Sequence, residues 1–209
     1  MFEYYKATIY YYGFYSLKVF MIKNIHRIVS KIRTKGAIVP SSRFLVNKMI
    51  SKIEYDKDLH ILQLGFGKGV FAKGVLKKIS ADSTLTVFEV NPKCRKYRIY
   101  DPRLTYIEDS AEYIHKYAGS KKFDHVVSTL PFASLPKDIC ERIFEQIKLN
   151  LKDGGKFLQF QYSLYSKKDI HNLFDKKPDI DFEILNIPPA FIYETEKPAD
   201  IQKLIQQSQ

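Results

Sequence analysis

The sequence has 209 residues, of which 45% are hydrophobic, so it is long and apolar enough for one domain with an appendage and does not fit a disordered chain. Its formal net charge of +11 predicts an anionic partner, either nucleic acid or an acidic membrane surface. Cys94 and Cys140 form no C-x-x-C pair, which favours a reduced cytoplasmic protein with both cysteines in its core and disfavours a metal site. No apolar run reaches the ~20 residues that a transmembrane helix needs.

The first 35 residues have the composition of a membrane-docking segment. Residues 1–15 are rich in tyrosine and phenylalanine, which suit a membrane interface or a lid. From Ser16 to Lys35 apolar residues recur at helical spacing, with six lysines and arginines and no acid, as in a helix that lies in a membrane interface. The alternative is an amphipathic helix that packs on its own domain. The basic residues expected to contact the membrane are Lys23, Arg27, Lys31, Arg33 and Lys35.

A second helix and a glycine turn follow. The stretch Gly36 to Ser42 breaks the first helix, and Ser41 or Ser42 is expected to cap a helix that runs through Ile53. An apolar strand then leads into Gly65-Phe66-Gly67-Lys68-Gly69, and a helix is predicted from Val70 to Ser80. Alternate glycines allow positive φ and let a ligand lie against the backbone. The third glycine of a dinucleotide fingerprint would fall at Val70, which disfavours pyrophosphate binding.

Two acidic residues follow the next two predicted strands. Glu89 lies near the end of the strand from Thr84 to Val90, where a carboxylate can accept both hydroxyls of a ribose. Asp109 follows the strand from Leu104 to Ile107, where it can receive an adenine amino group. From about residue 41 to 195, this arrangement resembles the class I S-adenosylmethionine-dependent methyltransferases. The alternative is a doubly wound fold with ordinary surface acids.

The resemblance implies a donor site and a product. The donor is S-adenosylmethionine, the product is S-adenosylhomocysteine, and no metal takes part. The residues expected to bind the donor are Gln63, Gly65, Gly67, Gly69, Glu89, Val90, Asp109, Ser110, Ser128 and Ser42.

The alternation of strands and helices predicts an α/β, Rossmann-like fold. We expect a seven-stranded, mainly parallel sheet with helices on both faces, preceded by the N-terminal amphipathic helix. His125 is expected to be a core histidine, and Asp153-Gly154-Gly155 is expected to stop a helix. The remaining predicted helices span residues 110–117, 137–151 and 168–175, and the remaining strands span residues 123–128, 156–162, 182–187 and 190–193.

The methyl acceptor is expected over the end of the fourth strand, at Ser128-Thr129-Leu130-Pro131-Phe132. Adenine N6-methyltransferases usually hold the exocyclic nitrogen with an Asn or Asp in this loop. Here Thr129 stands at that position, which weakens a nucleic-acid acceptor without excluding it.

The sequence also resembles the bacterial phospholipid N-methyltransferases of the soluble, peripheral type, from about residue 16 to 195. The matching motifs are Gly36-Ala37-Ile38-Val39-Pro40-Ser41-Ser42, the Gly65 to Gly69 turn, Glu89-Val90-Asn91-Pro92, Ser128-Thr129-Leu130-Pro131 and Gln159-Phe160-Gln161-Tyr162. Gln63, Phe66, Lys68 and Thr129 depart from that family, which usually has Glu, Pro, Thr and Gly there.

This second resemblance implies methylation of phosphatidylethanolamine toward phosphatidylcholine. We expect a monomer that associates peripherally with the cytoplasmic face of an anionic membrane. The acceptor site is expected to use Tyr162, Ser128, Leu130 and Pro131. We expect docking residues 1–35, a methyltransferase domain over 36–195 and a polar tail over 196–209. The alternatives are an RNA adenine N6-methyltransferase, including one that acts on rRNA, and a protein that binds S-adenosylmethionine without catalysis.

Overall fold

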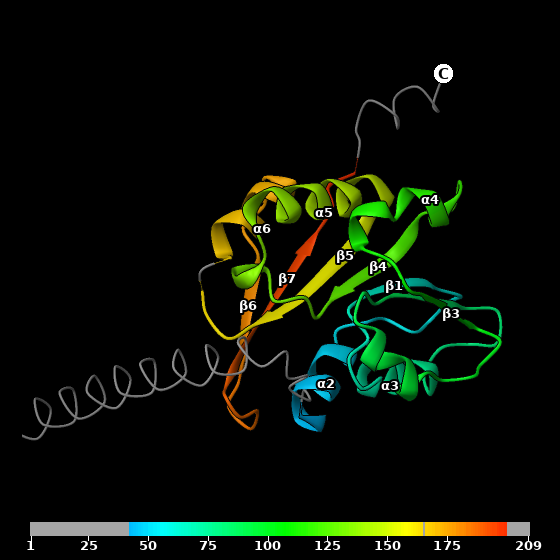
Figure 1. Cartoon of the computed structure of the whole chain (residues 1–209). Coiled ribbons are helices and arrows are strands. Elements are labelled where there is room, and N and C mark those ends of the chain that lie inside the picture. Colours follow the sequence, from blue (N-terminus) through cyan, green and yellow to red (C-terminus); the bar gives the residue numbers. More distant parts are fainter. Residues whose placement is uncertain (1–41, 165, 200–209) are drawn as a thin grey trace, which may run out of the picture. The chain divides into compact units, whose positions relative to one another are not determined.

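The structure is a computed structural model that describes residues 42–164 and 166–199. A central sheet lies between two layers of helices, with α4, α5 and α6 on one face and α2 and α3 on the other (Figure 1). The predicted docking segment, with Lys23, Arg27, Lys31, Arg33 and Lys35, lies outside the described residues, as does most of the polar tail. No helix within residues 42–164 and 166–199 is long and apolar enough to cross a membrane.

The sheet has seven strands in the order β3-β2-β1-β4-β5-β7-β6. The first five pair in parallel, whereas β7 is antiparallel to both β5 and β6. The predicted seven-stranded, mainly parallel sheet is therefore confirmed. The strands are β1 (His60–Leu64), β2 (Thr84–Phe88), β3 (Leu104–Ile107), β4 (Phe123–Ser128), β5 (Leu151–Gln161), β6 (Asp179–Glu183) and β7 (Ala190–Glu196). We call the side on which β1 to β5 end the carboxyl edge of the sheet.

The helices are short, and several have identifiable caps. The α-helices are α2 (Arg43–Ile50), α3 (Val70–Leu76), α4 (His115–Ala118), α5 (Lys137–Asn150) and α6 (Lys167–Phe174), and the 3-10 helices are η1 (Pro92–Tyr97), η2 (Ala111–Tyr113) and η3 (Phe132–Ser134). Ser42 caps α2 as predicted, because its Oγ accepts a hydrogen bond from the Leu45 N–H. A Cβ on Gly74 of α3 would lie 2.3 Å from Ile50, so this glycine lets α3 pack closely on α2.

The glycine pair after α5 does not stop that helix, contrary to the prediction. Strand β5 already begins at Leu151, and Gly154 and Gly155 lie inside it. Gly154 has φ 75°, and a Cβ on Gly155 would lie 2.9 Å from the Asp124 carbonyl oxygen. Gly154 therefore allows an irregular backbone angle within β5, and Gly155 allows the backbone of β4 to lie close to it. Both glycines are near the register shift between β4 and β5.

Other predicted boundaries also differ from the structure. The predicted strand over residues 182–187 is wrong beyond Glu183, where β6 ends and an exposed loop begins. The predicted helix over residues 110–117 is divided into η2 and α4, because Ser110 caps a separate 3-10 turn. The predicted helix from Val70 ends at Leu76 instead of Ser80, and β2 ends at Phe88, two residues before Val90.

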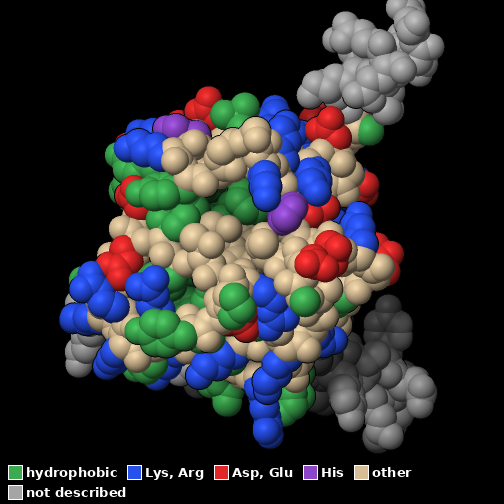
Figure 2. All heavy atoms as spheres, turned by 90° about the vertical axis from the view of Figure 1, so that its right-hand side faces the viewer, with side chains coloured by type: hydrophobic (Ala, Val, Ile, Leu, Met, Phe, Trp, Pro, Cys, Tyr) green, Lys and Arg blue, Asp and Glu red, His purple; other side chains and the backbone are tan. Residues whose placement is uncertain are grey.

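Both faces of the central strands are buried, whereas the edge strand β6 has no buried residue. The face under α5 and α6 packs a continuous cluster that includes Leu62, Leu64 and Phe157. His125 is 6% exposed, and Cys94 and Cys140 are both buried, so these three residues lie in the core as predicted. On the face shown in Figure 2, lysine and arginine side chains are spread widely, with acidic side chains between them.

Candidate functional site

The glycine turn after β1 has a backbone that ordinary residues rarely adopt. Gly65, Gly67 and Gly69 have φ values of 84°, 57° and 72°. A Cβ on Gly65 would lie 2.6 Å from Thr129 Oγ1, and a Cβ on Gly69 would lie 2.6 Å from Phe66 Cζ. Glycine is therefore required at both positions by backbone angle and by space.

Glu89 lies directly after β2 and binds the backbone of this turn. Its Oε2 accepts hydrogen bonds from the N–H groups of Phe66 and Gly67, each at 2.9 Å. Its Oε1 accepts one from the Asn91 N–H at 2.8 Å. Three backbone donors thus hold the carboxylate in one orientation at the carboxyl edge and leave one lone pair on Oε1 for a further donor.

Two buried side chains that the sequence analysis did not assign to the site lie at this turn. Cys94 is 1% exposed, and burial, with the nearby charge of Glu89, raises the pKa of its thiol to about 11. Phe66 is 3% exposed, and its ring packs edge to face on Tyr106 with centroids 5.0 Å apart. Phe66 stands where the resembled family usually has proline, and its aromatic ring fills the inside of the turn.

Asp109 follows β3 and is held by its neighbours. Its Oδ2 accepts a hydrogen bond from the Tyr117 hydroxyl at 2.8 Å, and its Oδ1 accepts one from the Ser110 N–H at 2.7 Å. These two bonds hold the pKa of Asp109 below its usual value. The Tyr117 ring packs edge to face on Phe88 of β2, with centroids 5.6 Å apart. Tyr117 is therefore a further candidate at this site.

Gln63 and Ser110 occupy different environments. Gln63 is fully buried, and its Nε2 donates to the Gly65 carbonyl at 2.6 Å. Its Oε1 is buried with no hydrogen-bond partner among the described residues. Ser110 Oγ accepts from the Glu112 N–H at 3.3 Å, so a helix cap accounts for this hydroxyl. Val90, next to Glu89, is 66% exposed.

The loop after β4 lies against the glycine turn. Thr129 Oγ1 donates to the carbonyls of Gly65 at 3.0 Å and Leu64 at 3.2 Å. Ser128 is fully buried, and its Oγ accepts from the Leu130 N–H at 3.2 Å. The Leu130 carbonyl accepts from the side chains of Gln159 and Gln161, at 3.0 and 3.2 Å. The next residue, Pro131, is exposed.

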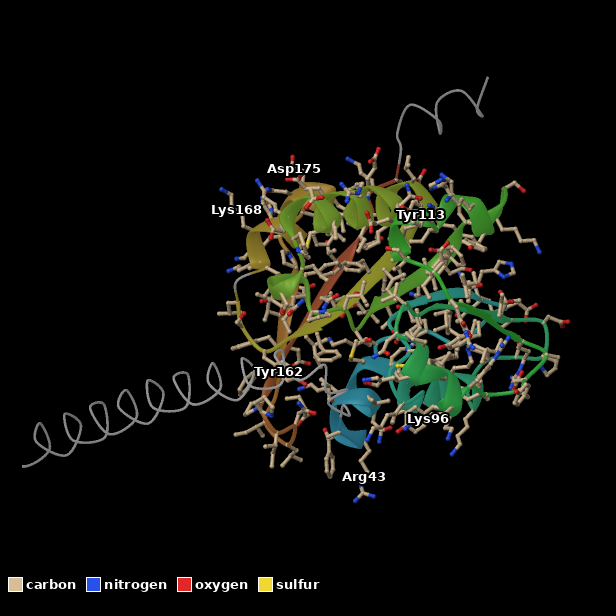
Figure 3. The ribbon with its side chains drawn as sticks, in the orientation of Figure 1. Arg43, Lys96, Tyr113, Tyr162, Lys168 and Asp175 are labelled. Atoms are coloured by element: carbon tan, nitrogen blue, oxygen red, sulfur yellow. The ribbon has the colours of Figure 1, made fainter. Side chains whose placement is uncertain are left out.

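Tyr162 comes directly after β5, at the same edge of the sheet (Figure 3). Burial raises the pKa of its hydroxyl, and a hydrogen bond with Asn186 opposes that rise only in part. The Phe160 ring packs edge to face on it, with centroids 5.7 Å apart. The hydroxyl of Tyr162 is therefore kept neutral near neutral pH.

Asn186 connects three separate parts of this edge and was not found from the sequence. It is 1% exposed, its Oδ1 accepts from the Ser42 N–H at 2.9 Å, and its Nδ2 donates to the Pro188 carbonyl at 2.7 Å. With its bond to Tyr162, it joins the start of α2, the loop after β6 and the end of β5. Ser42 and Asn186 are 144 residues apart in sequence, so no local pattern indicates this contact.

The structure thus brings the predicted donor and acceptor residues to one edge. The glycine turn, Glu89, Asp109, Ser128 and Tyr162 all lie at or just after the carboxyl ends of parallel strands, where open α/β sheets bind ligands. Within residues 42–164 and 166–199, no group of three or more His, Cys, Asp or Glu side chains is placed to hold a metal ion.

Solved structures with this architecture include an N-methyltransferase, NodS from Bradyrhizobium japonicum WM9, in complex with S-adenosyl-L-homocysteine. That structure matches with a TM-score of 0.59 at 10% identity, over 75% of this chain and 87% of that one. The chain has the fold of the class I S-adenosylmethionine-dependent methyltransferases. No protein family model matches the sequence.

Two curated proteins are similar in sequence. An ornithine lipid N-methyltransferase from Singulisphaera acidiphila is 24% identical over 166 residues, which cover 76% of this chain and 86% of that protein. A ribosomal RNA small subunit methyltransferase H from Christiangramia forsetii is 22% identical over 139 residues, which cover 62% of this chain and 46% of that protein. The lipid enzyme therefore matches over a larger share of both chains.

Proposed function

We propose that this chain is an S-adenosylmethionine-dependent N-methyltransferase that acts on the amine of a membrane lipid, with phosphatidylethanolamine as the acceptor. The observation that carries the proposal is the similarity to an ornithine lipid N-methyltransferase, which extends over 86% of that protein. Both lipids present a primary amine at a membrane surface, so one acceptor chemistry serves either of them.

The donor site fits S-adenosylmethionine in three places. The unpartnered, buried Oε1 of Gln63 suits the ammonium of the methionine part. The remaining lone pair on Oε1 of Glu89 suits a ribose hydroxyl, and Asp109 with Tyr117 suits the adenine. The backbone of Gly65, Gly67 and Gly69 would lie along the ligand, with Val90, Ser110, Ser128 and Ser42 as further donor-side candidates.

Thr129 sets the size of the space beside Gly65. Where the resembled family has glycine, this chain has a hydroxyl that binds the carbonyls of Leu64 and Gly65. With Thr129 instead of glycine at this position, the proposed donor site has less space on the side that faces the acceptor. This hydroxyl belongs to the wall between donor and acceptor.

The reaction requires little from the protein beyond placement. S-adenosylmethionine supplies a sulfonium methyl group, which an amine attacks directly. The residues around Leu130 and Pro131 then have to hold the amine in line and exclude water. A lysine-like amine with a pKa of about 10 must first lose its proton, which costs roughly 4 kcal/mol near neutral pH.

Tyr162 is proposed to orient the acceptor amine. A phenol is protonated near neutral pH, and burial, which raises the pKa of Tyr162, favours this form further, so the hydroxyl can accept a hydrogen bond from the amine. Its ring, with Phe160 beside it, can also face the cation that forms as methyl groups accumulate. Water is the better candidate for the proton, because Ser128 is fully buried.

Residues 1–35 are proposed to dock the protein on anionic lipid at the cytoplasmic face of the membrane. Their six lysines and arginines between Ser16 and Lys35, with no acid, favour such a surface. The basic residues Lys23, Arg27, Lys31, Arg33 and Lys35 are the proposed contacts. A monomer is sufficient for this arrangement.

Incubation with labelled donor tests the proposal. The protein is mixed with vesicles that contain phosphatidylethanolamine, with vesicles that contain ornithine lipid, or with RNA, and the label is followed. We expect label in phosphatidylethanolamine. Label only in ornithine lipid would change the acceptor, and binding of the donor without transfer would exclude catalysis on these substrates. A Gly65→Val variant is the inactive control, because its Cβ would collide with Thr129.

An RNA adenine methyltransferase is the second candidate. The similarity to a ribosomal RNA methyltransferase and the net charge of +11 favour it. Thr129 argues against it, because this loop then lacks the Asn or Asp that usually holds an adenine amino group. Label in RNA would support this candidate.

A further inference from the structure

The loop between β6 and β7 exposes large apolar side chains. Ile184, Leu185 and Ile187 are 65%, 59% and 86% exposed, and Phe44 at the start of α2 is 43% exposed. Their exposure contrasts with strands β1 and β4, whose apolar residues are buried. Exposed apolar clusters of this kind mark contacts with a protein or a membrane. We call Phe44, Ile184, Leu185 and Ile187 the apolar loop surface.

This surface lies at the carboxyl edge, beside the proposed acceptor site. Gln161 at the end of β5 pairs with Phe191 near the start of β7, and Glu183 at the end of β6 pairs with Ala190. The loop therefore leaves the sheet at the edge that holds Tyr162 and the glycine turn. Figure 1 shows this hairpin beside α2, extending beyond the sheet.

The loop is fixed in place, although its apolar side chains are exposed. Asn186 binds Ser42, Pro188 and Tyr162, and it is buried between two of the most exposed residues of the loop. The Leu185 N–H donates to the Glu183 carboxylate at 2.8 Å. The hydrogen bonds of the buried Asn186 thus hold the loop backbone while its apolar side chains face solvent. A contact surface that is formed before its partner binds has this arrangement.

The charges around the surface suit an anionic partner. Lys48 pairs with Asp181 at 2.8 Å and donates to the Phe182 carbonyl at 2.8 Å, which neutralises Asp181. The carboxylate of Glu183, at the start of the loop, is held instead by the Leu185 N–H. Arg43 is exposed, lies over the Phe44 ring at 5.4 Å and points away from the sheet (Figure 3). Ser42 binds the loop through Asn186, and the basic stretch of the sequence ends seven residues before it, at Lys35.

We infer that the apolar loop surface inserts into an anionic lipid bilayer and faces the acceptor edge toward the membrane. This inference rests on the proposed function, because a lipid acceptor has to be reached at a bilayer. Isoleucine and leucine side chains enter the acyl boundary, while Arg43 stays at the level of the anionic headgroups. Tyr162, which directly follows β5 at the edge where the loop leaves the sheet, then lies next to the headgroups.

Vesicle binding of the full chain, measured without methyl donor, tests the inference. The double variant Ile184→Ser and Ile187→Ser is compared with Leu149→Ser, in which an equally apolar residue, 56% exposed at the end of α5, lies at the opposite edge. On vesicles of phosphatidylglycerol and phosphatidylcholine, the double variant should bind at least about tenfold more weakly, and Leu149→Ser should bind as the wild type does. Equal binding by the double variant and the wild type would overturn the inference.

A single fluorescent label distinguishes lipid from other occupants of the surface. An environment-sensitive dye on Ile187→Cys should shift to the blue only when vesicles are added, and labelling is selective because Cys94 and Cys140 are buried. A shift already present without vesicles would mean that residues of the chain cover the loop, which would also overturn the inference. Both readouts are independent of methyl transfer, so loss of transfer with normal vesicle binding would count only against the proposed function.

Discussion

At the scale of single residues, Glu89 has the most constrained position in the proposed donor site. Three backbone N–H groups already hold its carboxylate, two of them from the glycine turn. We predict that Glu89→Gln weakens donor binding about 10- to 100-fold, because a charged hydrogen bond of roughly 1.5–3 kcal/mol is lost. Calorimetry with S-adenosylhomocysteine measures the change, and Glu108→Gln, an exposed acid after β3, is the matched control. Unchanged affinity of the Glu89 variant would remove this residue from the donor site.

Tyr162→Phe should show the opposite profile. The phenol hydroxyl bonds to Asn186 and is proposed to orient the amine, whereas no contact of Tyr162 with the glycine turn is seen in the described residues. We predict that the variant transfers methyl groups at least about tenfold more slowly, while the affinity for S-adenosylhomocysteine stays the same. If donor affinity fell and the transfer rate did not, the assignment of donor and acceptor sides would be reversed.

Some site residues could be placed from sequence, and others could not. Glu89 and Asp109 are found because each follows an apolar strand, and parallel strands bring their carboxyl ends to one edge. Asn186 binds Ser42 over 144 residues, and Cys94 lies in a basic 3-10 turn, so neither gives a local signal. Their positions depend on long-range packing, which a single sequence does not display.

At the scale of elements, Arg103 caps the carboxyl end of α3 from the start of β3. Its guanidinium donates to the carbonyls of Leu76 and Ile79, at 2.8 and 2.9 Å, and pairs with Asp101 at 2.9 Å. The hydrogen bonds from Arg103 lower the pKa of Asp101 to about 2. Because that pKa is lower than in the unfolded chain, this pair stabilises the fold above about pH 4, and the contribution is lost as the pH falls toward about 2.

We therefore predict that Asp101→Asn lowers the free energy of unfolding near neutral pH. The difference from the wild type should shrink as the pH falls from about 4 to about 2, because the wild-type carboxylate becomes protonated there. Urea unfolding at several pH values measures both effects, with the exposed Asp82→Asn as the control. A difference that stays constant down to about pH 2 would mean that the ion pair contributes no stability.

Elements with a clear apolar pattern were predicted well, whereas those defined by long-range packing were not. Strands β3 and β4 occupy the predicted residues, because both are bounded by sharp changes in polarity. Asp153-Gly154-Gly155 has the composition of a helix stop, yet the close approach of Asp124 makes it part of β5. Ile184 to Ile187 has the composition of a strand, yet these residues form the exposed loop.

At the scale of the whole molecule, the positive charge is concentrated at the start of the sequence. Residues 1–35 hold seven lysines and arginines and one acidic residue, so they supply more than half of the net charge of +11. The described part instead mixes both signs over its surface (Figure 2), with many lysines and arginines paired to carboxylates. Salt-sensitive attraction to an anionic membrane should therefore come mainly from the first 35 residues, and salt-resistant binding from apolar insertion.

This division predicts how vesicle binding responds to salt. Between about 0.1 M and about 1 M salt the Debye length falls from ~10 Å to ~3 Å, so binding of the full chain to anionic vesicles should weaken but not vanish. Replacing Lys23, Arg27 and Lys31 with Gln should weaken binding at low salt and flatten the salt dependence, since each basic residue contributes about 1 kcal/mol near an anionic leaflet. Replacing the exposed Lys73, Lys77 and Lys121 removes the same charge from the described part and should change the salt dependence little. Co-sedimentation over a salt series compares the three proteins, and equal slopes for the two triple variants would show that net charge alone, wherever it lies in the chain, brings the protein to the membrane.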